Sequence, residues 1–165
     1  MSRFDQRKQK VNTQFNISVQ TDKPSIEELE GKGKQLLQAR EYQLTITVFE
    51  QVLNLSPCSA DAQYYISLAL LNGQRPRLLT LSTIREIERR LQIATRHSPK
   101  SSHCFVLWAI VKEDYYVLNG LYDTPPTSSE LLQRVSSISV THFDEMIEHI
   151  QAPNNRVWEW LHTLS

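Results

Sequence analysis

The stretch GKQLLQAREYQLTITVFEQVLNLSP, residues 33–57, decides the fold class. Apolar and small side chains recur at spacings of three and four on both sides of Arg40, which is the period of an amphipathic helix. The stripe before the break contains Ile26, Leu29, Gly33, Leu36 and Leu37, and the stripe after it contains Tyr42, Thr45, Phe49, Val52 and Leu53. Because proline cannot continue a helix, the second stripe ends at Pro57. The stretch therefore predicts a helical hairpin.

The order of small and apolar residues in this hairpin is similar to that of a known repeat. The positions that carry the likeness are Gly33, Leu36, Tyr42, Phe49, Val52, Leu53 and Pro57. On these positions the segment from Leu29 to Pro57 resembles a tetratricopeptide repeat, a unit of about 34 residues that stacks on its neighbours. The segment departs from that pattern at Arg40, where glycine is usual, and at Thr45, where alanine is usual. The resemblance implies that residues 24–121 form a short superhelix of antiparallel helical hairpins.

A second hairpin is predicted between Ala60 and Pro99. It is longer than the usual repeat, and the surplus residues lie in an inserted loop, Gln74 to Ser82. Thr83 and Glu86 have the spacing of a capping box, which predicts the start of its second helix. Residues 102–119 then predict a long apolar helix, because Asn119-Gly120 is a typical helix stop.

The C-terminal part, residues 122–165, predicts shorter helices that cap the stack. Thr127 with Glu130 and Thr141 with Asp144 have capping-box spacing. A last helix contains Trp158 and Trp160, which point in different directions, so one continuous stripe cannot bury both. We take Trp158 as the candidate for an edge or an interface, where large aromatic side chains contribute strongly to binding, and the alternative is a tryptophan that is partly covered within the monomer. With only four glycines in 165 residues, the fold class expected for the whole chain is all-α.

The first 23 residues differ from the rest and predict an extended or disordered leader. Phe15, Ile17 and Val19 alternate with polar residues, which is the period of a strand. A lone strand must pair with something or stay disordered, so we predict pairing with a partner. The leader is also rich in Gln and Asn, and it resembles leaders found in bacterial signalling and conflict-system proteins.

The sequence contains no recognisable catalytic or cofactor motif. It has no phosphate-binding glycine loop and no nucleophile turn, so we expect a non-enzymatic protein without a cofactor. No apolar run is long enough to span a membrane, and the N-terminus lacks the apolar core of a signal peptide, so we expect a cytoplasmic protein. Cys58 and Cys104 are expected to be reduced thiols.

His142, Glu145 and His149 lie at i, i+3 and i+7, a spacing that could present three ligands to a metal ion. The trio matches no specific metal signature and borders an apolar stripe. We therefore interpret these residues as polar neighbours of the core, and no metal residue is predicted.

Candidate partner-binding residues come from charge and from exposed apolar side chains. Residues 1–23 and 74–100 are net basic, whereas residues 24–73 and 101–165 are net acidic, so the neutral total hides opposed blocks. The candidates are Arg85, Arg89 and Arg96 on the predicted helix 83–97, Lys34 in the first hairpin, Phe15, Ile17 and Val19 in the leader, and Trp158. The inner face of the hairpins does not reproduce the lysine and asparagine clamp with which related repeats bind chaperone tails.

These features predict an adaptor or scaffold that binds another protein or peptide, in a bacterial signalling or defence-type complex. The alternative is a small nucleic-acid-associated protein that uses the arginines of helix 83–97. The oligomeric state stays open.

Overall fold

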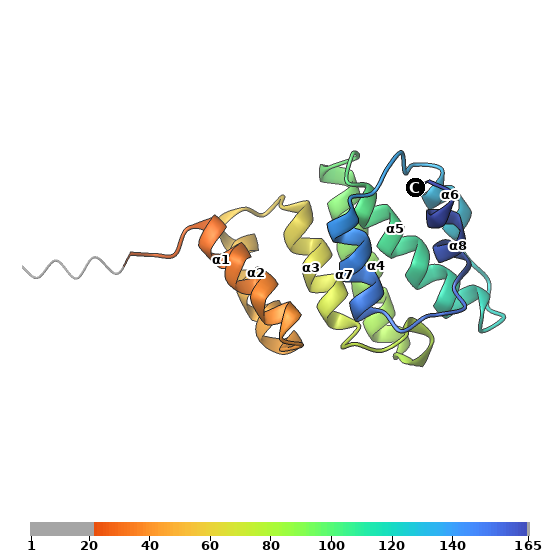
Figure 1. Cartoon of the computed structure of the whole chain (residues 1–165), viewed down its shortest axis with the longest axis horizontal. Helices are drawn as coiled ribbons and strands as arrows, with labels where there is room; N and C mark the ends of the chain where they lie inside the picture. The colour runs from red at the N-terminus through yellow and green to blue at the C-terminus, as the bar shows by residue number, and fades with distance from the viewer. Residues whose placement is uncertain (1–21, 165) are drawn as a thin grey trace, which may run out of the picture.

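The computed structural model describes residues 22–164, which form eight α-helices, one 3-10 turn and one π-helical turn, with no strand among them (Figure 1). This confirms the all-α class. The elements are α1 (Ile26–Gln38), α2 (Tyr42–Leu55), α3 (Ala60–Leu70), η1 (Pro76–Leu78), α4 (Leu81–His97), α5 (Ser102–Lys112), η2 (Glu113–Val117), α6 (Ser128–Leu132), α7 (Val140–His149) and α8 (Arg156–His162). The leader residues Phe15, Ile17 and Val19 lie outside the described residues, so their pairing stays a prediction.

Helices α1 to α5 pack in chain order, each against the next (Figure 1). Gly33 on α1 permits the first contact, because a Cβ atom at this position would lie 2.5 Å from Cε2 of Phe49 on α2. Phe49 is fully buried, and its ring stacks on Tyr65 of α3 with a centroid distance of 4.8 Å. The ring of Phe49 therefore contacts both α1 and α3.

The turn between α1 and α2 lies at Arg40, where the sequence predicts a break between two helices. Arg40 has φ 59°, in the left-handed region that glycine adopts more easily. Its guanidinium lies 3.4 Å from the backbone carbonyl of Glu148 and 3.5 Å from the hydroxyl of Tyr42. The arginine thus keeps the turn geometry and adds contacts that a glycine could not make.

Side-chain caps begin most of the helices, and two of them differ from the sequence prediction. The box of Thr127 and Glu130 is confirmed in both directions. Helix α4 begins after Thr80 and not at Thr83, and α7 begins after Ser139 and not at Thr141. In both cases an earlier hydroxyl accepts a backbone N–H three residues on, which adds residues to the helix start.

The end of α5 buries three consecutive charged residues. The expected helix over 102–119 is present, but its last part is the π-helical turn η2. Asp114 is fully buried and accepts two hydrogen bonds from the Arg75 guanidinium, at 2.6 and 3.3 Å, and one from the backbone N–H of Arg77 at 2.9 Å. Arg75 therefore holds the inserted loop on η2, directly after α5.

Lys112 and Glu113 hold the C-terminal segments in the same way. Lys112 is 1% exposed, and its ammonium donates to the carbonyl of Thr124 at 2.8 Å and lies 3.1 Å from a carboxylate oxygen of Asp123. Glu113 accepts from Arg156 of α8 at 2.8 Å and from the hydroxyl of Ser128 at 3.2 Å. The linker, α6 and α8 are thus all tied to one end of α5.

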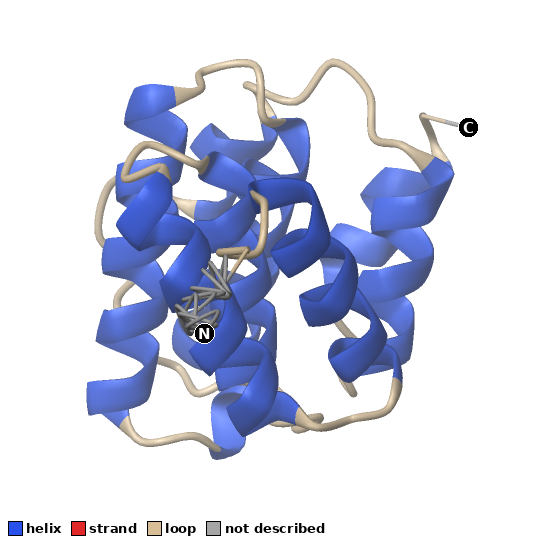
Figure 2. Ribbon diagram, turned by 90° about the vertical axis from the view of Figure 1, so that its left-hand side faces the viewer, coloured by secondary structure: helices blue, strands red, loops and turns tan. Residues whose placement is uncertain are grey.

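After α6 the chain returns, and α7 lies against α3 and α5 (Figures 1 and 2). Tyr65 donates to a Glu145 carboxylate oxygen at 3.0 Å, and the Tyr42 hydroxyl lies 2.9 Å from Nδ1 of His149. One hydrophobic core runs from Leu29 in α1 to Leu161 in α8. The C-terminal helices therefore share a core with the hairpins.

Replacement of Gly33 by alanine should destabilise the protein by about 1–3 kcal/mol, because the new methyl group overlaps the ring of buried Phe49. Gly31 on the same helix is the matched control. A Cβ atom there meets nothing within 4 Å, so Gly31→Ala should stabilise the helix by about 0.5–1 kcal/mol. Chemical denaturation measures both changes. Equal effects of the two substitutions would contradict the close contact of α1 with α2.

Asp114→Asn should lower the free energy of unfolding by about 3 kcal/mol, because the substitution removes a buried charge from its arginine partner. Asp144→Asn serves as the control, since Asp144 is exposed on α7 and its loss should change stability by less than about 0.5 kcal/mol. Urea denaturation followed by circular dichroism compares the two. A value for Asp114→Asn near that of the control would show that the buried pair adds little.

Candidate functional site

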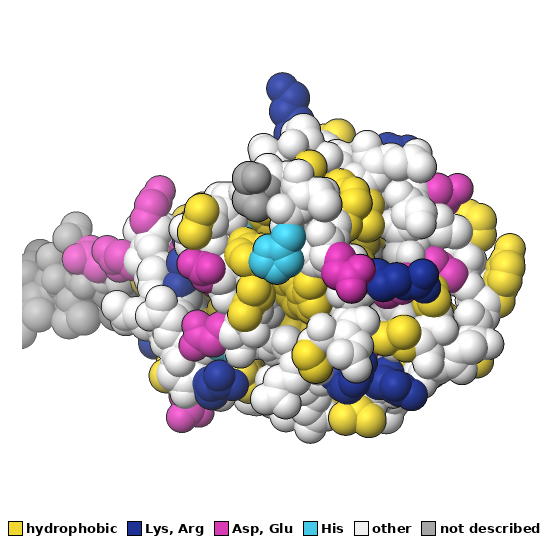
Figure 3. All heavy atoms as spheres, turned by 45° about the vertical axis from the view of Figure 1, so that its right-hand side comes forward, with side chains coloured by type: hydrophobic (Ala, Val, Ile, Leu, Met, Phe, Trp, Pro, Cys, Tyr) yellow, Lys and Arg dark blue, Asp and Glu magenta, His cyan; other side chains and the backbone are white. Residues whose placement is uncertain are grey.

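An apolar cleft lies between α7 and α8. It consists of two adjoining hollows of about 140 and 650 Å³ that share His162 on their walls. The residues lining them are Ser137, Ile138, Val140, Phe143, Leu161, His162 and Leu164 in the first, and Ile147, Ile150, Gln151, Ala152, Pro153, Trp158 and His162 in the second. We call this feature the α7–α8 cleft. Hydrophobic side chains gather in a hollow on this side of the molecule (Figure 3).

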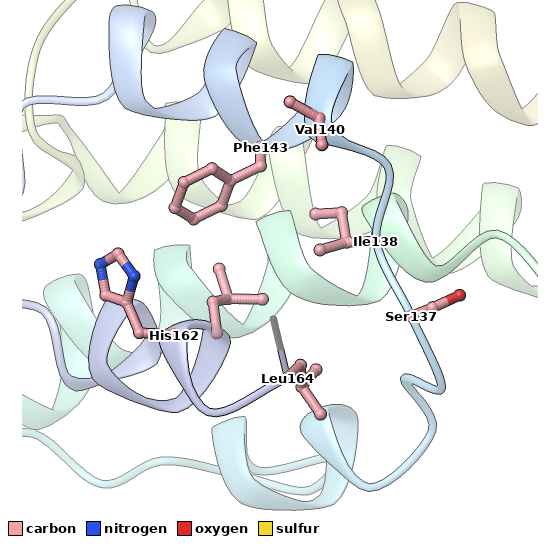
Figure 4. A pocket seen from close by; sticks show the side chains of 7 residues that line it. Ser137, Ile138, Val140, Phe143, His162 and Leu164 are labelled. Carbon is pink, nitrogen blue, oxygen red and sulfur yellow. The ribbon is translucent and has the colours of Figure 1, made fainter.

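Aromatic rings join the two hollows of the cleft. The ring of Phe143 lies edge-on to Trp158 at 6.1 Å and to His162 at 5.7 Å. Phe143 and Ile138 face His162 and Leu164 across the smaller hollow (Figure 4). A single substitution at Phe143 would therefore alter both parts of the cleft.

Three apolar side chains of the cleft are exposed to solvent. Val140, Ile147 and Leu164 are 75%, 50% and 44% exposed. Trp158, a predicted binding residue, is half-buried, and its ring N–H already donates to the carbonyl of Ala152 at 2.7 Å. Its ring is thus fixed with its polar atom satisfied.

A second cluster lies on the other side of α7 and joins three helix starts. Asp61, His103 and His142 occupy the first turns of α3, α5 and α7. The Nε2 atom of His103 lies 2.9 Å from Oδ1 of Asp61, and the rings of the two histidines stack at 4.0 Å with an angle of 6°. Ser139 holds the Nδ1 atom of His142 at 2.9 Å. We call these three residues the Asp61–His103–His142 cluster.

The surroundings of this cluster lower the pKa values of two of its residues, His142 and Asp61. Burial, aided by the neighbouring His103, lowers the pKa of His142 to about 4, so its imidazole is neutral at pH 7. The hydrogen bond from His103 lowers the pKa of Asp61, with burial acting against it. At neutral pH the cluster therefore combines a carboxylate with at least one neutral imidazole.

A pair of tyrosines separates this cluster from the first hairpin. The ring of Tyr64 makes edge contacts with both His103 and His142. Glu145 accepts from Tyr65 at 3.0 Å, and burial raises the pKa of Glu145. The ammonium of Lys34, a predicted binding residue, lies 5.4 Å from the centre of the Tyr65 ring. Lys34 is exposed but already has an intramolecular partner for its charge.

The three residues of α7 with metal-like spacing have separate partners and do not converge. His142 contacts His103, Glu145 contacts the tyrosines, and His149 contacts Tyr42. Their interpretation as polar neighbours of the core fits these contacts. The sequence did not indicate Asp61 and His103, because they are distant in the chain. The sequence feature that these two residues share is a serine N-cap two positions earlier, Ser59 before Asp61 and Ser101 before His103. This feature is informative only when the starts of the helices are known to meet.

The predicted arginine surface is partly neutralised. Arg85, Arg89 and Arg96 are exposed on α4. Arg89 donates two hydrogen bonds to Glu86, at 2.9 and 2.8 Å, and neighbouring Arg90 pairs with Glu50 at 2.6 Å. Arg85 and Arg89 also line a shallow depression. The arginines remain a candidate surface with less free charge than their number suggests.

No protein-family model, curated protein or solved structure matches the chain. Among the described residues, none of the helices combines the length and the apolar content that crossing a membrane requires. We therefore base the functional proposals on the geometry of three features: the α7–α8 cleft, the Asp61–His103–His142 cluster and the arginines of α4.

Protonation of His149 should destabilise the fold in mildly acidic solution. His149 is 1% exposed, its Nε2 atom has no hydrogen-bond partner among the described residues, and burial lowers its pKa. Below the ordinary pKa of about 6.5, the unfolded state binds the proton more readily than the folded state, so the free energy of unfolding falls as the pH is lowered. Melting temperatures measured from pH 7 downward should show a smaller drop for His149→Gln than for the unaltered protein.

The control for this experiment is His97→Asn, which alters an exposed histidine at the end of α4. Other groups, including His142 and Glu145, also titrate in this range, so the comparison between variants isolates His149. Identical pH profiles for His149→Gln and the unaltered protein would contradict the prediction.

Proposed function

We propose that the chain is a non-enzymatic adaptor that binds another protein through the α7–α8 cleft. The observation that supports this proposal is the exposed apolar surface of Val140, Ile147 and Leu164 around a fixed aromatic wall. Such concave apolar surfaces with aromatic side chains are typical of partner-binding sites.

The charges around the cleft favour a basic partner. Asp144, Glu148 and Glu159 are exposed on the two helices that form it. Arg156, the arginine of α8, donates to Glu113 at 2.8 Å. A partner with apolar anchors flanked by lysine or arginine would complement both the cleft and its rim.

The dimensions of the cleft suit a short amphipathic helix. Helix α7 has ten residues and is therefore about 15 Å long. A partner helix of similar length would present apolar anchors at i, i+3 or i+4, and i+7. We propose this class of ligand as the occupant.

A tetratricopeptide-like stack is part of the same proposal. The sequential packing of α1 to α5 and the close contact at Gly33 support it. Helix α7 lies on α3 and α5, so in this proposal the partner occupies the outer α7–α8 cleft and not the inner face of the hairpins. Action in the cytoplasm, a bacterial signalling or defence-type complex, and binding through the leader, Arg85, Arg89 and Arg96 also remain proposals from the sequence.

Selection of peptides from a displayed library on the full chain tests this function. Enriched peptides should combine apolar residues at helical spacing with basic residues. Their affinity should fall at least about tenfold for Ile147→Glu, because the change places a charge in the apolar cleft. Leu44→Glu is the matched control, since Leu44 is a similarly exposed apolar residue on α2, 51% exposed against 50% for Ile147.

Two outcomes would overturn the adaptor proposal. One is equal binding of the selected peptides by both variants, which would place the binding site away from the cleft. The other is salt-dependent binding of arbitrary RNA or DNA that Arg85→Glu with Arg89→Glu abolishes, which would support the nucleic-acid alternative.

A further inference from the structure

We propose that Asp61, His103 and His142 form a binding site for a divalent transition-metal ion, with Zn²⁺ as the expected occupant. The site goes beyond the proposed adaptor function and does not depend on the partner of the cleft. The first observation is convergence: one potential ligand atom from each residue lies within 4.8 Å of the other two, although the residues come from three helices.

The ligand set selects the class of metal. Two imidazoles and one carboxylate are typical ligands of zinc and related transition metals, whereas Mg²⁺ and Ca²⁺ prefer oxygen ligands. Nδ1 of His142 is occupied by the Ser139 hydroxyl, which leaves Nε2 of that ring as the ligand atom. A hydrogen bond to the second ring nitrogen is the usual arrangement around metal-binding histidines.

One ligand-atom distance is close to the value that zinc requires, and all of them are within 4.8 Å. With bonds of about 2.0–2.1 Å, tetrahedral ligand atoms lie about 3.3 Å apart. The atoms of Asp61 and His103 are already 2.9 Å apart, so the adjustment falls mainly on His142. The two rings lie in nearly parallel planes, so they must rotate out of the stack for their lone pairs to meet at one point. The Asp61 side chain is 55% exposed and is free to rotate with them.

The site has room for a fourth ligand from solvent. A hollow of about 430 Å³, lined by residues that include Asp61, His103 and Lys100, opens beside the cluster. Three protein ligands and one water molecule would complete a tetrahedral ion. Among the described residues this is the one group of three potential ligands that converge, so the expected stoichiometry is one ion per chain.

A bound ion would link α7 to α3 and α5. Asp61 belongs to α3, His103 to α5 and His142 to α7, so one ion would bridge all three helices. Helix α7 also forms one wall of the cleft, through the adjacent Phe143. The metal would therefore stabilise the folded chain and hold that wall in place.

Calorimetric titration of the full, chelator-treated chain with Zn²⁺ tests the proposal. One ion should bind per chain, and at a free concentration of about one hundred times Kd it should raise the melting temperature by about 5–10 °C. Asp61→Asn and His142→Asn should each weaken binding at least about tenfold and remove most of that rise. Asp61 is largely exposed, so Asp61→Asn should fold even if a histidine variant does not.

Two control variants separate this site from other metal-binding groups. His97→Asn changes an exposed histidine on α4, and Cys58→Ser removes the exposed thiol beside the hollow. Both should bind Zn²⁺ like the unaltered chain. The proposal is overturned if Zn²⁺ does not bind, if Asp61→Asn binds it with unchanged affinity, or if Cys58→Ser abolishes binding.

Discussion

The buried charges at the end of α5 are the constraint on which the remaining structure depends. Lys112, Glu113 and Asp114 are consecutive and almost fully buried, and they point to different segments because successive side chains on a helix diverge by about 100°. Removing charged groups from water is unfavourable unless each finds a partner, so the partners are as necessary as the charges. Asp114 fixes the inserted loop, Lys112 fixes the linker at Asp123 and Thr124, and Glu113 fixes α6 and α8. This network positions the chain for the return of α7.

The position of α7 links the two regions with functional potential. One side of this helix meets the tyrosines and the Asp61–His103–His142 cluster, and the other side forms the wall of the α7–α8 cleft. Helix α7 therefore covers the face of α3 and α5 on which it packs. The exposed apolar surface of α7 lies on its outer side, where α8 supplies Trp158. In the proposed function, partner binding and helix docking would both depend on this one short helix.

The sequence predicted local features better than distant contacts. Periodicity and capping chemistry identified the first hairpin, the break at Arg40, and the box of Thr127 with Glu130, because these depend on neighbours in the chain. The starts of α4 and α7 were placed too late, since several hydroxyl residues precede each helix and spacing alone does not choose among them. The cluster could not be predicted, because Asp61 and His142 are distant in sequence and meet only after α7 returns. Trp158 was identified as a candidate, whereas the cleft around it depends on the packing of α7 against α8.

Helix α7 contacts residues that are distant in the sequence, and this separation affects the order of folding. Helices α1 to α5 each pack on the next element in the chain, so their loops close at little entropic cost. The bonds from α7 to Tyr42, Tyr64 and Tyr65 instead join residues 107, 81 and 80 positions apart. We expect the hairpins to assemble first and α7 to dock last, as a separate cooperative unit. The same unit would open first in the native state, so amide hydrogens of α7 would exchange with solvent before those of α3 and α5.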